Sequence, residues 1–264
     1  MSEANPPNPS AIDETGSGTA KCYYQLREVT KSFGAKQVLN GVSLDIFKGE
    51  TLVILGGSGS GKSVTLKILV GLLEADGGQV LFEDRDITHL REKEYYPIRK
   101  RVSYLFQGGA LFDSMNIYQN LAYPLEEHRR LAPREILPMV RESLKMVELE
   151  NIEHLYPSDL SGGMMKRVAL ARAIIDKPEI VLYDEPTTGL DPLTTRAINQ
   201  LIRKLQRELS ITSVVVTHDM STTFHVADRL CFLDKGELAF SGTLDEASRT
   251  THPVLRAYLS GGQS

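Results

Sequence analysis

The stretch GGSGSGKS, from Gly56 to Ser63, fits the pattern G-x-x-x-x-G-K-[ST]. Glycines let backbone N–H groups close around phosphate oxygens, and the lysine at this spacing reaches the terminal phosphates of a nucleotide. The hydroxyl of Ser63 can ligate Mg²⁺. A glycine-rich turn with a chance Lys-Ser pair would lack the buried strand expected before this loop and the helix expected after it. The stretch therefore predicts a phosphate loop in which Lys62 and Ser63 contact the nucleotide.

Two adjacent carboxylates, Asp184 and Glu185, follow the apolar run IVLY. Open α/β sheets bind ligands at the carboxyl ends of their strands, so both side chains are expected near the phosphates. We expect Asp184 to hold Mg²⁺, usually through water, and Glu185 to polarise the attacking water. Such a pair can also merely cap the next helix. A phosphate loop alone leaves kinase, GTPase and ATPase open, but a kinase does not need the second carboxylate.

Three single residues follow other predicted strands. His218 comes after TSVVVT, where it could contact the γ-phosphate or act only as a structural hydrogen bonder. Gln107 ends VSYLFQ, where its amide could reach Mg²⁺ or the attacking water. Phe33, in KSFG, could stack on adenine, a contact worth on the order of 1 to 3 kcal/mol, or could be an ordinary strand aromatic.

The stretch LSGGMMKRVALARA places a serine and two glycines before a helical pattern. Ser161 can be an ordinary N-cap, with Gly162 and Gly163 as turn punctuation. A helix start without side chains in the way is also an anion site, because its free N–H groups and the helix dipole favour negative charge. The apolar positions of the helix fall on one face: Met165, Val168, Ala169 and Ala173.

The segments that must position these residues predict an α/β fold. TLVIL, at 51–55, is a short apolar run typical of a strand buried on both faces, and helical spacing follows it at Leu66, Leu69, Val70 and Leu73. Between about 115 and 160 no strand is evident, and this indicates a helical insert in a domain with a parallel sheet. Other strands are expected at 23–33, 42–46, 79–82, 102–106, 179–183 and 212–216, with a hairpin at 230–240. The helical period of the insert is carried by Ile136, Val140, Leu144 and Val147.

The composition of the chain limits the classes of protein to which it can belong. The chain has 264 residues, 41% hydrophobic and 24% charged, which fits one compact globular unit. A net charge of -4 argues against nucleic-acid binding, and the basic run 99–101 reads as a solvated face. Cys22 and Cys231 have no metal-ligand spacing and suit a reducing compartment. With no long apolar run and no signal-peptide pattern, the chain is expected in the cytoplasm, with residues 1–20 as a disordered tail.

Taken together, the motifs resemble the nucleotide-binding subunit of ATP-binding-cassette (ABC) transporters. The resemblance rests on six motifs in order: the phosphate loop at 56–63, Gln107, LSGGM at 160–164, IVLYDEP at 180–186, GLD at 189–191 and His218. It implies a P-loop NTPase (RecA-like) core with a parallel sheet, an N-terminal antiparallel β subdomain and an α-helical subdomain inserted at about 110–165. The ATPase domain is then expected at 21–250, with 251–264 as a short C-terminal tail.

The resemblance also implies a site made by two subunits. In a head-to-tail homodimer, each ATP lies between the phosphate loop of one subunit and the LSGG helix of the other, which two-fold symmetry allows. Catalysis is then expected from Glu185, His218, Lys62 and Gln107, and Mg²⁺ binding from Ser63, Gln107 and Asp184. The expected nucleotide contacts are Phe33, Gly56, Gly57, Ser58, Gly59, Ser60, Gly61, Lys62, Ser63, Val64, Ser161, Gly162, Gly163 and Asp191.

One departure from the family pattern indicates a subgroup. Met164 stands where the family usually has Gln or Glu, and Met165 where it often has Gln. Together with FQGGALFDSMNIYQNLAYPL at 106–125, this resembles the ATPase of maintenance-of-lipid-asymmetry (Mla) and related Mce-type lipid transporters. The resemblance implies phospholipid transport between membranes, driven from the cytoplasmic face of a bacterial inner membrane. The implied partners are a separate permease, docked on the helical insert near 111–123, an Mce-domain protein and a small accessory subunit.

Two other functions stay open. An importer ATPase for amino acids or another small solute shares every catalytic motif. A soluble ABC protein acting on nucleic acid or the ribosome usually has two cassettes or long coiled-coil insertions, and this chain has neither.

Overall fold

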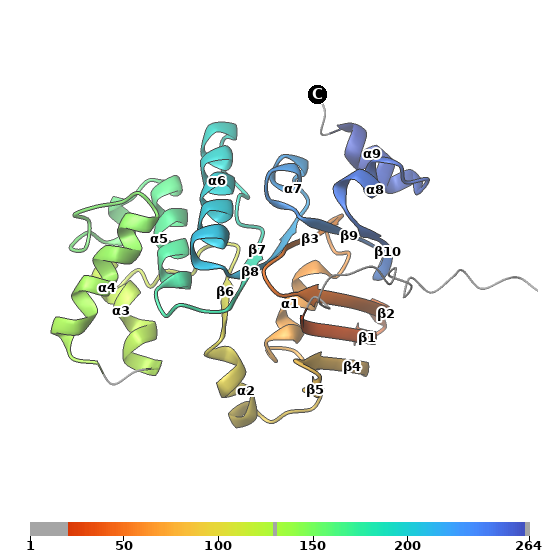
Figure 1. The fold of residues 1–264 in the computed structure, drawn as a ribbon, viewed down its shortest axis with the longest axis horizontal. Helices are drawn as coiled ribbons and strands as arrows, with labels where there is room; N and C mark the ends of the chain where they lie inside the picture. The colour runs from red at the N-terminus through yellow and green to blue at the C-terminus, as the bar shows by residue number, and fades with distance from the viewer. Residues whose placement is uncertain (1–20, 129–130, 262–264) are drawn as a thin grey trace, which may run out of the picture.

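The computed structural model describes residues 21–128 and 131–261, which form two β-sheets with helices around them (Figure 1). The smaller sheet is antiparallel, in the order β2-β1-β4-β5. The larger sheet has the order β10-β9-β3-β8-β7-β6, parallel from β9 to β6 with β10 antiparallel at the edge. The strands of the smaller sheet are β1 (Cys22–Phe33), β2 (Lys36–Phe47), β4 (Gly77–Phe82) and β5 (Arg85–Asp86). Those of the larger sheet are β3 (Thr51–Gly56), β6 (Val102–Leu105), β7 (Ile180–Asp184), β8 (Thr212–Thr217), β9 (Arg229–Asp234) and β10 (Glu237–Gly242).

The strand β3 is buried along its whole length, as its continuous apolar run predicts. Its side chains alternate between two hydrophobic cores, with Val53 and Leu55 in one and Leu52 and Ile54 in the other. The second core also contains the inner face of the smaller sheet and the helix α1 (Lys62–Leu69). The phosphate-loop residues therefore lie between a strand and a helix that are both fixed by packing.

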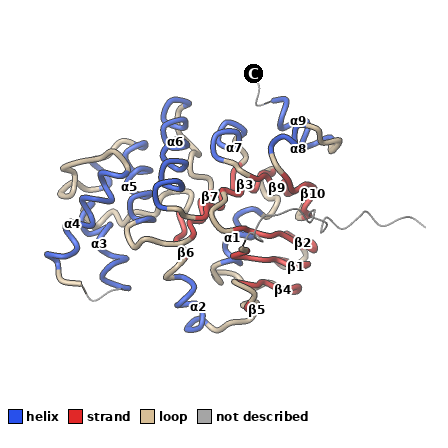
Figure 2. Tube along the Cα trace, in the orientation of Figure 1, coloured by secondary structure: helices blue, strands red, loops and turns tan. Residues whose placement is uncertain are grey.

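The helical insert lies at one side of the molecule (Figure 2). It contains α3 (Ile117–His128), α4 (Pro133–Met146) and α5 (Gly162–Ile174), which pack on one another. The helix α5 also packs on β6 and on α6 (Pro192–Leu209), and so it joins the insert to the sheet. The predicted apolar stripe of the insert is confirmed, because all four residues are buried: Ile136, Val140, Leu144 and Val147.

The predicted fold class is confirmed, with its parallel core sheet, antiparallel N-terminal sheet and helical insert. One side chain departs from the predicted buried face of α5. Val168, Ala169 and Ala173 are buried there, but Met165 is exposed, and its neighbour Met164 packs against the main core instead. The remaining helices are α2 (Glu92–Arg99), α7 (Met220–Val226), α8 (Leu244–Ser248), α9 (Pro253–Gly261) and the 3₁₀ turn at Pro157–Asp159.

The C-terminal segment differs from the tail expected at 251–264. Residues 253–261 form α9, and Leu255 and Leu259, one helical turn apart, are buried in the main core. The ring of Tyr258 lies 5.5 Å from that of Phe232 on β9. This short apolar stripe anchors the helix beside the sheet. The expected tail at 1–20 lies outside the described residues, as do residues 262–264, and within the described ranges no helix has the length and apolar character needed to span a membrane.

Candidate active site

The phosphate loop connects β3 to α1, and two of its glycines are required by their surroundings. Gly61 precedes α1 with a left-handed backbone, φ 106°, and a Cβ there would lie 2.5 Å from the Leu39 side chain. A Cβ on Gly56 would lie 2.4 Å from the carbonyl oxygen of Leu233. The loop backbone is thus packed closely against β2 and β9, which leaves its other side open to a ligand.

The polar groups of the loop are suited to an anion. In the described part of the chain, the N–H groups of Gly59 and Gly61 have no hydrogen-bond partner, and the buried hydroxyl of Ser60 has none either. Lys62 Nζ donates to the carbonyls of Gly56 at 2.8 Å and Gly57 at 3.0 Å. Burial lowers the pKa of Lys62, while the nearby carboxylates of the site oppose this shift. Free donors and a buried cation in one loop fit a phosphate group.

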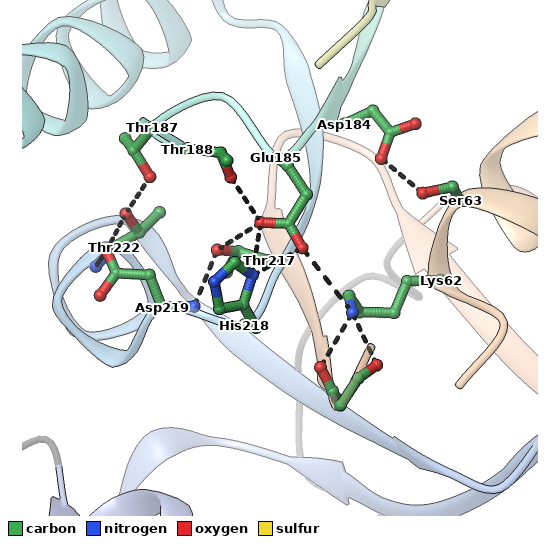
Figure 3. Close-up of polar contacts among 12 residues, drawn as sticks. Lys62, Ser63, Asp184, Glu185, Thr187, Thr188, Thr217, His218, Asp219 and Thr222 are labelled. Carbon is green, nitrogen blue, oxygen red and sulfur yellow. Dashed lines mark hydrogen bonds and ion pairs between the residues drawn. The ribbon is translucent and has the colours of Figure 1, made fainter. Parts of the chain in front are cut away.

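Ser63 and Asp184 meet at the end of the parallel sheet. Ser63 Oγ donates to Asp184 Oδ1 at 2.7 Å (Figure 3). Tyr104 Oη donates to the other carboxylate oxygen at 2.8 Å. A hydroxyl and a buried carboxylate are hard oxygen ligands of the kind that Mg²⁺ prefers. The donor set therefore fits the predicted metal.

Glu185 is fixed in an uncommon backbone conformation. Its φ is 50°, in the left-handed region that non-glycine residues rarely adopt. Its N–H donates to Val216 O at 3.0 Å, which ties it to β8. The buried carboxylate lies 3.7 Å from Lys62 Nζ and 2.9 Å from His218 Nδ1, and Thr188 Oγ1 donates to it at 3.2 Å (Figure 3). The structure thus brings together the predicted carboxylate, lysine and histidine.

Two predicted residues lie outside this cluster. Gln107 has an exposed side chain, and within the described residues no hydrogen bond joins its amide to Ser63 or Asp184. Its backbone carbonyl instead accepts a hydrogen bond from Lys166 Nζ on α5. Phe33 ends β1 with 49% of its surface exposed, so its ring is open to a ligand.

In the LSGG segment Leu160 is buried in the main core, and the residues that follow it face solvent. Ser161 is the N-cap of α5 and accepts from Met164 N at 3.3 Å, while Ser161 and Gly162 are exposed. Across 21–128 and 131–261, no hydrogen bond connects this segment to the phosphate loop. Asp191 caps α6 by accepting from Leu193 N and Thr194 N, each at 3.0 Å. Nucleotide contacts by these residues therefore stay predictions.

Sequence reasoning missed the residues that hold the carboxylates in place. Tyr104 contacts Asp184, and Thr188 and Thr217 contact Glu185. Their positions along the chain carry no signal of this, because the contacts join separate strands or depend on the turn after β7. The aromatic at Tyr104 reads only as an ordinary strand residue.

Comparison with known proteins agrees with this geometry. Residues 39–188 match the model of the ABC transporter family. This chain belongs to the ABC transporter family. As an ATP-binding domain of that family, it binds ATP with Mg²⁺ and is an ATPase.

Two relatives and one solved structure illustrate the likeness. The chain is 36% identical to the "Intermembrane phospholipid transport system ATP-binding protein MlaF" of Escherichia coli K12, covering 89% of this chain and 88% of that one. It is 42% identical to the "Probable ribonucleotide transport ATP-binding protein mkl" of Mycobacterium leprae, and the match covers 90% of this chain and 68% of that protein. A dimeric post-hydrolysis structure of the ATP-binding cassette MJ0796 with ADP and Pi is 35% identical, with a TM-score of 0.77 over 84% of this chain and 98% of that one.

Proposed function

We propose that this ABC ATPase powers phospholipid transport between an inner and an outer membrane through a separate permease. The observation that carries the catalytic part is the cluster of Glu185, Lys62 and His218 beside an open phosphate loop. The lipid part is supported by the E. coli relative, whose name states intermembrane phospholipid transport, and by the Mla-like stretch at 106–125.

The proposed chemistry assigns one task to each residue of the cluster. Lys62 leaves the carbonyls of the loop to bind the β- and γ-phosphates, and Glu185 accepts the proton of the attacking water. His218, hydrogen-bonded to Glu185, orients that carboxylate and contacts the γ-phosphate. Ser63 and Asp184 are the residues that would hold Mg²⁺. When bound, Mg²⁺ neutralises charge on the phosphate oxygens.

The second half of each site is proposed to come from another copy of the chain. The solvent-facing N-terminus of α5 offers Ser161, Gly162 and Gly163 to a γ-phosphate held by the partner's phosphate loop. The dimeric structure of the MJ0796 cassette supports this arrangement. In the proposed dimer of this chain, Phe33 would stack on adenine and Asp191 would lie near the shared nucleotide. The carboxylate of Asp191 also caps α6.

A groove between the sheet and the insert is the proposed permease-docking surface. It has a volume of about 470 Å³ and is lined by exposed aromatics, among them Phe106, Phe112 and Tyr123. Gln107 directly follows Phe106 of this groove, and its proposed role is to report Mg²⁺ or water at the nucleotide site to the insert. The chain would then sit on the cytoplasmic face of a bacterial inner membrane, with an Mce-domain protein and a small accessory subunit as further partners and without nucleic acid.

A different cargo is the second candidate. The M. leprae relative carries the name of a ribonucleotide transporter, and every catalytic motif is shared between lipid and small-solute systems. An importer of ribonucleotides, amino acids or another small solute would therefore use the same site.

Copurification tests the cargo. The tagged chain is expressed with the membrane proteins encoded beside it, and bound molecules are analysed by mass spectrometry against an unrelated membrane protein from the same cells. We expect phospholipid enrichment in the complex, and ATPase activity that depends on the permease. The Glu185→Gln complex serves as the matched control without hydrolysis. Bound ribonucleotide beyond the catalytic ATP, or a bound amino acid, with no lipid enrichment would favour the second candidate.

A further inference from the structure

A tyrosine to which the motifs give no role contacts the carboxylate proposed to hold Mg²⁺. Tyr104 lies on β6, where it pairs in register with Leu182 of the neighbouring strand β7. Its hydroxyl donates to Asp184 Oδ2, and Ser63 donates to Oδ1. Each carboxylate oxygen therefore has its own hydroxyl donor, and the two donors come from β6 and from α1.

The two hydroxyl donors fix the terminal side-chain torsion of Asp184, which would otherwise be free to vary. The terminal torsion of an aspartate is broad, so a carboxylate held at one oxygen can still turn about its own axis. Because Tyr104 occupies Oδ2, the plane of the carboxylate is set and Oδ1 stays directed at Ser63. A hydrogen bond from a hydroxyl to an ionised carboxylate is also stronger than one between neutral groups, and Asp184 is buried.

The tyrosine itself is well anchored. Burial, and then the hydrogen bond to Asp184, raise the pKa of Tyr104, so the phenol stays a neutral donor at physiological pH. Its ring centroid lies 4.3 Å from that of Phe106, and the ring forms part of the wall of the aromatic groove. The hydroxyl at the site is therefore attached to a ring that packing holds in place.

We propose that Tyr104 is a positioning residue for the Mg²⁺ ligand Asp184. The inference rests on the proposed metal role of Asp184 and assigns a new task to this chain's own β6. Groups that hydrogen-bond a metal ligand orient it, and their removal typically costs about 10- to 100-fold in metal affinity. The phosphates of the nucleotide are also metal ligands, so the low end of this range is expected here.

Measuring metal affinity distinguishes a positioning role of Tyr104 from a merely structural one. The full chain is saturated with the non-hydrolysable analogue AMP-PNP and titrated with Mn²⁺, an oxygen-binding substitute for Mg²⁺, by electron paramagnetic resonance. For Tyr104→Phe we expect Mn²⁺ affinity about 10-fold lower, with AMP-PNP binding in EDTA unchanged. Tyr95→Phe is the matched control, because it removes a phenol that donates to the carbonyl of Ile87, and it should bind Mn²⁺ like the wild type.

Two further variants make each outcome decisive. Tyr104→Met also removes the hydroxyl and should repeat the loss, so a folding defect in one variant does not end the test. Asp184→Asn should weaken Mn²⁺ binding at least as much as either. If Asp184→Asn binds Mn²⁺ normally, the proposed metal role fails. If Asp184→Asn loses affinity while both Tyr104 variants keep it, the positioning role of Tyr104 is refuted and the metal role stands.

Discussion

Replacing Glu185 by Gln removes the proton acceptor and its negative charge but keeps the shape of the side chain. The amide is nearly the same size, so contacts with Thr188 and His218 can persist. A general base contributes about 10² to 10⁴ in rate, which corresponds to about 3 to 5 kcal/mol of the activation barrier. We therefore expect ATPase turnover to fall by that factor under saturating Mg·ATP.

Binding should move in the opposite direction to turnover. The Glu185 carboxylate lies 3.7 Å from Lys62 Nζ, and two unit charges near 4 Å interact by about 4 kcal/mol at an effective dielectric constant of about 20. Removing this charge frees the lysine and removes repulsion toward the γ-phosphate. The variant is expected to bind ATP at least as tightly as the wild type, measured with a fluorescent analogue. Because ATP binds between two subunits and is no longer hydrolysed, the dimer should persist once it has formed. Size-exclusion chromatography should therefore show a dimer with ATP and a monomer without it.

The matched control is Glu50→Gln. Glu50 is also a largely buried glutamate, but it lies in the turn before β3, away from the phosphates. Its carboxylate pairs with Arg229 of β9. Because the variant alters this ion pair at the end of β3 opposite the phosphate loop, it should change stability and leave turnover of the folded protein unchanged. If Glu185→Gln retained turnover within about three-fold of the wild type, a loss below the general-base range, Glu185 would not be the base.

The remaining predictions concern the dimer and acid stability. Lys62→Ala and Ser161→Arg chains should each be inactive alone, because every site of either homodimer has one damaged half. Mixing them should restore up to about a quarter of wild-type ATPase activity, because half of the dimers are heterodimers with one intact site of two. If verified, differentially tagged heterodimers show no recovery, this counts against a site shared between two subunits. Arg101, by its hydrogen bond, lowers the pKa of Glu179 from 4.5 to about 2. Glu179 thus stabilises the fold above pH 4.5 and loses this contribution as the pH falls toward 2. Since this carboxylate is partly exposed, Glu179→Gln should cost about 1 to 2 kcal/mol at neutral pH and much less near pH 3 in urea unfolding; an equal cost at both values would refute the linkage.

Local chain chemistry was enough to predict the strand, glycine loop and helix that carry Lys62 and Ser63. A short apolar run that ends in glycines is typical of a strand buried on both faces, and the glycine pattern needs no distant residue to define it. The same holds for the carboxylates at the end of β7, since strand direction alone brings them to the ligand edge of the sheet.

Tertiary structure decided what these residues touch. Tyr104 meets Asp184 because β6 and β7 are neighbours in the sheet, although 80 positions separate the two residues in the chain. Glu185 takes its left-handed backbone because β8 and His218 hold it, and no propensity of a glutamate predicts that. Leu255 and Leu259 turn an expected tail into a packed helix because they are buried in the main core, and Tyr258 packs on Phe232 of β9. Contacts between distant segments depend on strand order and packing, and these are set only when the whole chain has folded.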